Sequence, residues 1–184
     1  MKKTIISAAL LSLTSFAALA NNSTQTYDVV RGSAETFSVS QTEQLGKFRA
    51  VLMPNRGSWR HHTNRGSRFS RLGLVLDGVI KGVLNPDFTL THSFVNNNRT
   101  GVLYTAHDSV ITIFAGDPTC QNGTGTTPFE IEEMLNIVAG TGVYADVEAG
   151  SYMILRGVVN NCPSLPEFGK NTFEVIEGSV TFSQ

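Results

Sequence analysis

The chain has 184 residues, of which 41% are hydrophobic and 16% are charged, and its formal net charge is −1 at pH 7. This near-neutral balance argues against general binding to polyanions, so we expect no nucleic-acid partner. The length suits a single domain with one hydrophobic core.

The first 20 residues have the composition of a secretory signal peptide. Two lysines precede an apolar run from Ile5 to Leu19, and Ala18-Leu19-Ala20 matches the A-x-A pattern of a cleavage site. No stretch of the chain approaches the roughly 18 unbroken apolar residues of a membrane span. We therefore expect an exported protein, periplasmic or secreted, without a membrane partner. Cleavage leaves 12 basic against 15 acidic residues, a net charge of −3.

Residues 21–34 are polar and uneven in pattern, and we expect them to form a flexible N-terminal arm. The remainder, residues 35–184, is expected to be one β-barrel domain. Its first period-two segment begins at Gln44, and Phe48 and Leu52 share one face of it. This alternation predicts a strand with one buried face.

The segment 56–71 is the most basic in the chain, with five arginines, two histidines and one tryptophan. Two interpretations stay open. The segment is either a solvated loop over an otherwise acidic protein or, through Ser58–Arg71, a contact for an anionic partner. A metal site at His61 and His62 is disfavoured, because adjacent residues of a strand point to opposite faces.

Alternation is most regular from Leu72 to Leu84, where Gly78 and Gly82 occupy positions on the apolar face. Glycines at such positions suit the tight bending of a barrel strand. No window shows a convincing period of 3.6 residues. About eight strands result, which favours an all-β fold, either a barrel or a sandwich. The later strands are expected at 88–94, 101–115, 129–137 and 152–159.

Two ionisable residues fall on apolar faces of these strands. Glu133 lies two residues from Ile131 and from Leu135, and His92 has an apolar residue two positions away on each side. A buried carboxylate has a raised pKa and can act as a general acid or base, with His92 as its partner in proton transfer. The alternative is that each residue is buried, hydrogen-bonded and structural.

The motifs of several enzyme classes are absent from the sequence. It contains no G-x-S-x-G, H-E-x-x-H, Walker loop or C-x-x-C, so hydrolase, zincin, NTPase and redox functions lack their usual support. We expect no cofactor and no metal. Cys120 and Cys162 lie in polar segments that the strand order brings to the same end of the sheet. In an exported chain, such a pair predicts one disulfide.

The stretch 136–160 carries the clearest sequence signature. A glycine bend at Ala139-Gly140-Thr141-Gly142 is followed by Tyr144 and by an apolar strand that ends in Arg156-Gly157-Val158-Val159-Asn160. These residues resemble the C-terminal half of the allene oxide cyclase barrel and dirigent proteins, which usually read G-G-T-G where this chain has one glycine fewer. The resemblance covers the chain from Leu72 onward. It implies a closed antiparallel eight-stranded β-barrel with an apolar cavity.

Self-association is also expected. Apolar residues occupy both faces of Val110–Phe114 and of Tyr152–Val159, whereas a barrel buries only one face of each strand. A second copy of the chain would cover the other face. The family resemblance implies a trimer.

Three functions stay open at this point. The barrel interior could bind a small apolar molecule without chemistry. It could instead be the cavity of a cyclase or isomerase in which Glu133 or His92 transfers a proton. The third function is a non-catalytic interaction protein that binds a partner through Ser58–Arg71. The residues expected to line an interior ligand site are Leu72, Leu74, Phe88 and Ile131.

Overall fold

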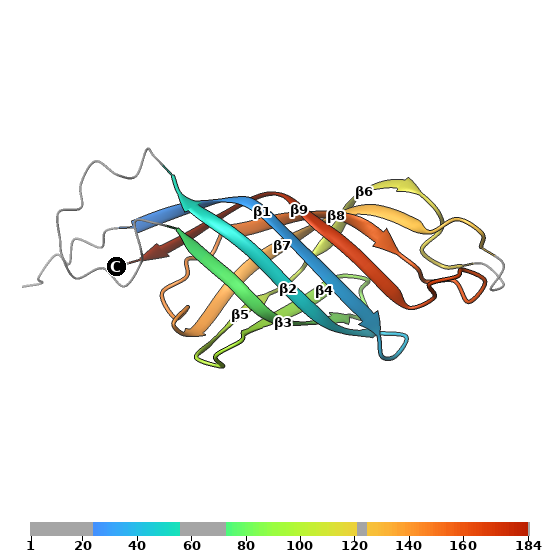
Figure 1. Cartoon of the computed structure of the whole chain (residues 1–184), viewed down its shortest axis with the longest axis horizontal. Coiled ribbons are helices and arrows are strands. Elements are labelled where there is room, and N and C mark those ends of the chain that lie inside the picture. Colours follow the sequence, from blue (N-terminus) through green and yellow to red (C-terminus); the bar gives the residue numbers. More distant parts are fainter. Residues whose placement is uncertain (1–23, 56–72, 121–124, 184) are drawn as a thin grey trace, which may run out of the picture.

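The computed structural model describes residues 24–55, 73–120 and 125–183. The expected signal peptide, Leu72 and the basic segment 56–71 lie outside the described residues. Within the described ranges, no helix has the length and apolar character to cross a membrane. The described chain is all-β (Figure 1). Its strands are β1 (Thr24–Ser38), β2 (Glu43–Pro54), β3 (Leu74–Leu84), β4 (Leu90–Asn96), β5 (Gly101–Thr105), β6 (Ser109–Ala115), β7 (Phe129–Gly142), β8 (Ser151–Val159) and β9 (Lys170–Ser183).

Eight of these strands close an antiparallel barrel, which confirms the predicted fold class. The order around the ring is β1-β2-β3-β4-β5-β7-β8-β9, and β9 pairs with β1. Closure depends on β5, which pairs with β4 on one side and with β7 on the other. Among the described strands, β6 lies outside the ring and pairs with β7 alone.

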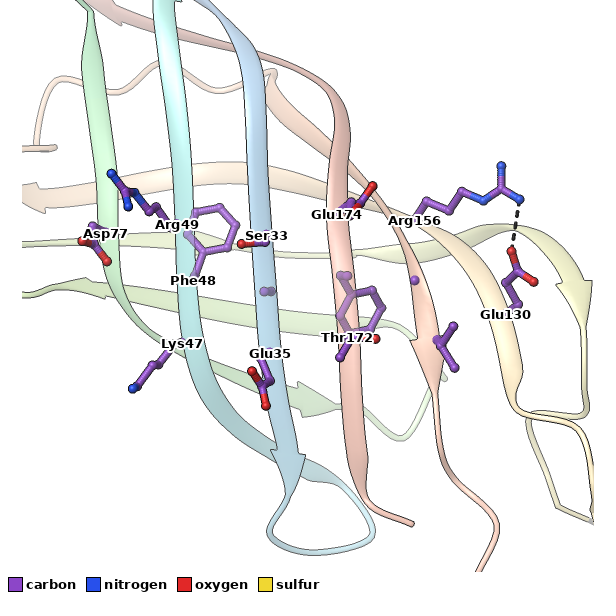
Figure 2. A pocket seen from close by; sticks show the side chains of 14 residues that line it. Ser33, Glu35, Lys47, Phe48, Arg49, Asp77, Glu130, Arg156, Thr172 and Glu174 are labelled. Carbon is purple, nitrogen blue, oxygen red and sulfur yellow. Dashed lines mark hydrogen bonds and ion pairs between the residues drawn. The ribbon is translucent and has the colours of Figure 1, made fainter. Parts of the chain in front are cut away.

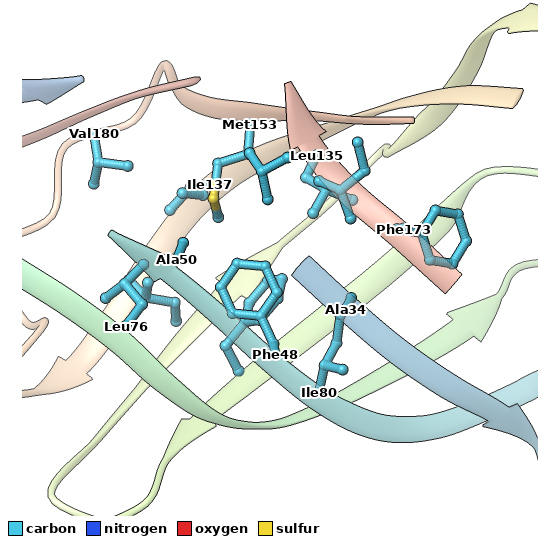
Figure 3. Packing of buried hydrophobic residues seen from close by; sticks show 14 of the residues in the cluster. Ala34, Phe48, Ala50, Leu76, Ile80, Leu135, Ile137, Met153, Phe173 and Val180 are labelled. Atoms are coloured by element: carbon cyan, nitrogen blue, oxygen red, sulfur yellow. The ribbon is translucent and has the colours of Figure 1, made fainter. Parts of the chain in front are cut away.

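Period-two alternation places the large apolar side chains inside the barrel. In β3, for example, Leu76 and Ile80 are buried, while Val75 and Val79 are exposed. All eight barrel strands contribute to one hydrophobic cluster. Figure 3 shows part of it, with Phe48 of β2 among side chains from several other strands. Hydrophobic burial in a single continuous core therefore holds the closed sheet together.

Two of the expected strand boundaries are wrong. The arm expected over residues 21–34 belongs to β1 from Thr24 onward, because this segment pairs with both β2 and β9 and buries Tyr27 and Ala34. The single strand expected over 101–115 is two strands, β5 and β6, separated at residues 106–108. The glycine bend expected at Ala139–Gly142 lies later than predicted, because residues 139–142 still belong to β7 and pair with β5. The chain turns after Gly142, which has a φ of +59°.

The predicted disulfide is also confirmed. Cys120 and Cys162 are bonded, with their Cα atoms 5.3 Å apart and a sequence separation of 42. The bond joins the segment after β6 to the segment between β8 and β9. Such bonds persist in oxidising compartments, so the disulfide fits a non-reducing environment.

Candidate acid–base site

His92 and Glu133 both point into the barrel, as the alternation predicts. Their exposed fractions are 8% for His92 in β4 and 4% for Glu133 in β7. The Nδ1 atom of His92 lies 3.9 Å from Oε1 of Glu133. In the ring, β5 lies between β4, which carries His92, and β7, which carries Glu133. The residues that follow the C-terminal end of β5 are therefore close to this pair.

Asp108 is the third ionisable member of the cluster. It lies in the break between β5 and β6, next to His107, whose φ of 55° is uncommon for a residue other than glycine. Its backbone exchanges two hydrogen bonds of 2.9 Å with Leu90 at the start of β4. The Asp108 side chain is fully buried. The break in the strand therefore turns a carboxylate inward beside His92.

Three donors satisfy the Asp108 carboxylate. The Nδ1 of His92 donates to Oδ2 over 2.8 Å, since a carboxylate can only accept. The Thr105 hydroxyl donates to the same oxygen, and the backbone N–H of Asn136 donates to Oδ1 over 2.7 Å. Thr105 also accepts from the backbone N–H of His92 over 2.7 Å. These contacts set the orientation of the imidazole and leave Nε2 as its second functional atom.

The carboxyl group of Glu133 is less well satisfied than that of Asp108. Its Oε1 is buried and has no hydrogen-bond partner among the described residues. Burial raises the pKa of the Glu133 carboxyl, the charge on His92 opposes this effect and the charge on Asp108 reinforces it. Burial lowers the pKa of His92, but the hydrogen bond to Asp108 and the charges of both carboxylates outweigh burial and raise it. Both shifts favour the protonated form, so Glu133 and His92 each keep their proton to higher pH than the free side chains do.

Gly82 of β3 lies against the His92 ring. A Cβ on Gly82 would lie 2.8 Å from Nε2, so a larger residue would displace the imidazole. The same Cβ would lie 3.9 Å from Cβ of Gln44, whose Oε1 accepts from Thr36 over 2.8 Å and from Asn171 over 3.0 Å. Polar groups therefore flank Gly82 on both sides at this end of the barrel interior.

The residues expected to line an apolar ligand site are only partly brought together. Ile131 is buried on the inward face of β7, and Leu74 is half-buried and packs against the core. Phe88 is 83% exposed, so the expectation that it lines the interior is wrong. It lies in the turn before β4 with a φ of 64°, which removes it from the alternation of that strand.

A pocket of about 660 Å³ is open to solvent and is lined by polar outward-facing residues and by the core residues Ala34, Phe48 and Phe173 (Figure 2). Its charged side chains have both signs, and two of them, Arg156 and Glu130, form an ion pair of 3.1 Å. A pocket that borders the interior beside Phe48 and Phe94 has only about 10 Å³, near the minimum for one water molecule. The two rings are 4.6 Å apart between centroids, so side chains fill the barrel at that level.

The cluster also has the kinds of donor atom that bind a divalent cation. His92, Asp108 and Glu133 offer one nitrogen and two carboxylate oxygens within 4.8 Å of one another. Both Asp108 oxygens already accept hydrogen bonds, however, and a cation would have to displace the one from His92. Proton chemistry therefore fits the observed contacts better than metal binding does.

Sequence reasoning identified His92 and Glu133 but missed Asp108 and Thr105. Asp108 lies within 101–115, which the sequence pattern predicts as one strand. Both faces of that strand carry apolar residues, so alternation does not show which way Asp108 points. The available signal was the polar pair His107-Asp108 inside that strand, which marks a break. Comparisons of the chain with known protein families, with curated proteins and with solved structures found no significant match.

Proposed function

We propose that this protein is a proton-transfer catalyst of the isomerase type that binds a small, largely apolar carbonyl compound at the His92 end of its barrel. Glu133 transfers the proton, His92 holds the substrate oxygen, and Asp108 positions His92. The observation that carries the proposal is the buried Oε1 of Glu133. This atom has no hydrogen-bond partner among the described residues and lies 3.9 Å from Nδ1 of His92.

A buried polar atom without a partner costs stability, so its retention calls for a role. Asp108 shows what a purely structural carboxylate looks like in this protein, since its oxygens accept three hydrogen bonds. Oε1 of Glu133 differs, since no hydrogen bond from a described residue reaches it. A ligand that meets its carboxyl group would remove the deficit, and the inward apolar neighbours Ile131 and Leu135 would contact the apolar part of that ligand.

The chemistry follows from these positions. Charged Glu133 takes a proton from the carbon between a carbonyl group and a neighbouring double bond. The C–H electron pair forms a new C=C bond, and the carbonyl π pair moves onto oxygen, which accepts a hydrogen bond from Nε2–H of His92. Glu133 then returns the proton to the far carbon. The double bond has shifted, and no co-reactant is consumed.

The test uses 5-nitrobenzisoxazole, a small apolar probe that opens when a base removes its ring C–H proton. The N–O bond breaks, the proton goes to the base, and a coloured phenolate forms. We expect the protein to accelerate this reaction beyond free acetate at the same carboxylate concentration. Glu133→Gln should lower the rate about 100-fold or more, because glutamine keeps the shape and cannot accept the proton.

The matched control is Glu132→Gln, because the adjacent Glu132 points out of the barrel. It should keep the wild-type rate. The rate should rise with pH as Glu133 loses its proton and fall when His92 loses its own, both above the ordinary pKa values of the two groups. A rate no greater than that of acetate, or one that survives Glu133→Gln, would overturn the proposal.

We also propose that the protein acts after export and belongs to the allene oxide cyclase barrel and dirigent superfamily. The Cys120–Cys162 disulfide and the apolar N-terminal segment support export. The closed eight-stranded antiparallel ring, together with the bend that ends β7, supports the family assignment. Mass analysis of protein recovered from its host would test export, since the mature chain should begin at Asn21.

A further inference from the structure

The edge of β6 is the part of the sheet that the barrel leaves without a neighbouring strand. Among the described strands, every other one pairs on both sides. Four large apolar side chains of β6 are well exposed, and none of its residues is charged. Charged residues are the usual protection of a free edge, so this edge is suited to pairing. The four are Val110 (37%), Ile111 (44%), Ile113 (56%) and Phe114 (45%).

The pairing of β6 with β7 is also incomplete. The register shifts between Val110 and Thr112 and again between Ile113 and Ala115. Ile111 and Phe114 therefore have no register partner on β7. Bulged residues leave backbone groups outside the ladder, and such groups need other hydrogen-bond partners once they are covered. A strand added along the free edge would supply them.

The order of residues in β6 is complementary to itself. In an antiparallel pair of two β6 strands centred on Thr112, Val110 of one copy lies opposite Phe114 of the other, and Ile111 lies opposite Ile113. Each pair joins two apolar side chains of the kinds that favour neighbouring strands. No like charges meet, because the strand has none. A second copy of this chain can therefore pair with the free edge of β6 through apolar contacts on every matched pair of large side chains.

We propose that β6 is a two-fold interface, at which β6 of one copy pairs antiparallel with β6 of a second copy and extends the sheet from one barrel to the next. An isologous contact of this kind closes on itself and yields dimers. It differs from the trimer that the family resemblance implies. The interface lies outside the barrel ring, so it does not depend on the proposed proton transfer.

The experiment measures self-association of the mature, disulfide-bonded protein by sedimentation equilibrium. Two single variants, Ile111→Glu and Ile113→Lys, each place a charge opposite an isoleucine of the second copy. Each should weaken dimerisation about tenfold or more. The double variant places opposite charges face to face twice across the two-fold axis, so it should recover most of the affinity. Val79→Lys, at an exposed site on the outer face of β3, is the control and should leave the dimer intact.

Circular dichroism and the intact disulfide would show that each variant is folded. Recovery by the double variant supports antiparallel pairing centred on Thr112, because other registers do not bring the two substituted positions together. A wild-type monomer at tens of micromolar would overturn the proposal. So would a trimer, or a dimer that both single variants leave unchanged.

Discussion

β5 and β6 pair along the same edge of β7, one after the other, yet they have opposite roles. β5 pairs with residues 137–142 of β7, carries β4 on its other side and closes the barrel. β6 pairs with residues 130–134 and has no strand on its other side among the described residues. The difference arises at Ala106–Asp108, where the chain leaves one register on β7 and enters another.

A short break in this strand places a buried carboxylate beside His92 and leaves the following strand outside the ring. Asp108 turns inward because the break ends β5, and its carboxylate then holds His92 and the backbone of Asn136. One residue later the chain continues as β6, outside the ring, where its apolar side chains meet solvent. Four predictions, from the largest expected effect to the smallest, test how far the two strands differ.

The largest effect concerns the Cys120–Cys162 disulfide, which lies beyond the end of β6. Replacing both Cys120 and Cys162 with serine should lower the free energy of unfolding by about 4 kcal/mol, because the bond spans 42 residues and restricts the unfolded chain. Chemical denaturation measures the loss, and hydrogen exchange should show β6 losing protection before β5. Reductant should reproduce the loss in the wild type and leave the variant unchanged. Equal loss of protection in both strands would contradict the distinction.

The next effect concerns the break itself. Asp108→Ala removes a buried acceptor from three donors, which should cost about 3 kcal/mol in the free energy of unfolding. The control is Asp77→Ala, at an exposed position on the outer face of β3. Its cost should be below about 0.5 kcal/mol. Similar losses in the two variants would show that the Asp108 contacts do not stabilise the break.

A smaller effect concerns the space beside His92. Gly82→Ala places a methyl group 2.8 Å from Nε2, so the ring or the strand must shift, at a cost of about 2 kcal/mol. The imidazole signals of His92 in NMR spectra should shift, and the base-catalysed ring opening of 5-nitrobenzisoxazole should become slower. Val79→Ala, on the outer face of the same strand, provides the comparison. Unchanged His92 signals in Gly82→Ala would show that the ring has room that the structure does not indicate.

The smallest effect is a pH dependence of stability. Burial raises the pKa of Glu133 above its ordinary value of 4.5, so the unfolded chain releases this proton at lower pH than the folded protein does. Stability is therefore complete below the unfolded pKa and falls as pH rises toward the folded pKa, by at most about 1.4 kcal/mol per pH unit for one proton. The pKa of His92 is also raised, so its contribution falls in the same direction, above its ordinary 6.5.

Glu133→Gln should remove the first part of that decline and also reduce the part due to His92, because the charge of Glu133 contributes to the raised pKa of His92. Denaturation midpoints measured across the acidic and neutral range would show the change in slope. Glu132→Gln should retain the wild-type profile, because Glu132 lies on the outward face of β7. An identical pH profile in wild type and Glu133→Gln would mean that this carboxyl group is not desolvated in the folded protein.

Much of the fold could be predicted from the sequence because it depends on side chains that alternate between the two faces of a strand, with a period of two residues. Alternating side chains place Leu76 and Ile80 in the core of β3, and the same rule places His92 and Glu133 inside the barrel. The disulfide followed from the strand order, which brings two loops to one end. These predictions succeeded because each depends on the direction of side chains along one strand or on the order of strands.

Only the tertiary structure decided which residues complete the site and where β6 lies. Phe88 continues the apolar pattern of β4 in the sequence but is exposed, because the turn before that strand ends the alternation. Asp108 lies 16 residues from His92 and 28 from Asn136 along the chain, yet it binds both. Those contacts exist because barrel closure brings β4, β5 and β7 together, and local pattern carries no information about a register that distant strands set.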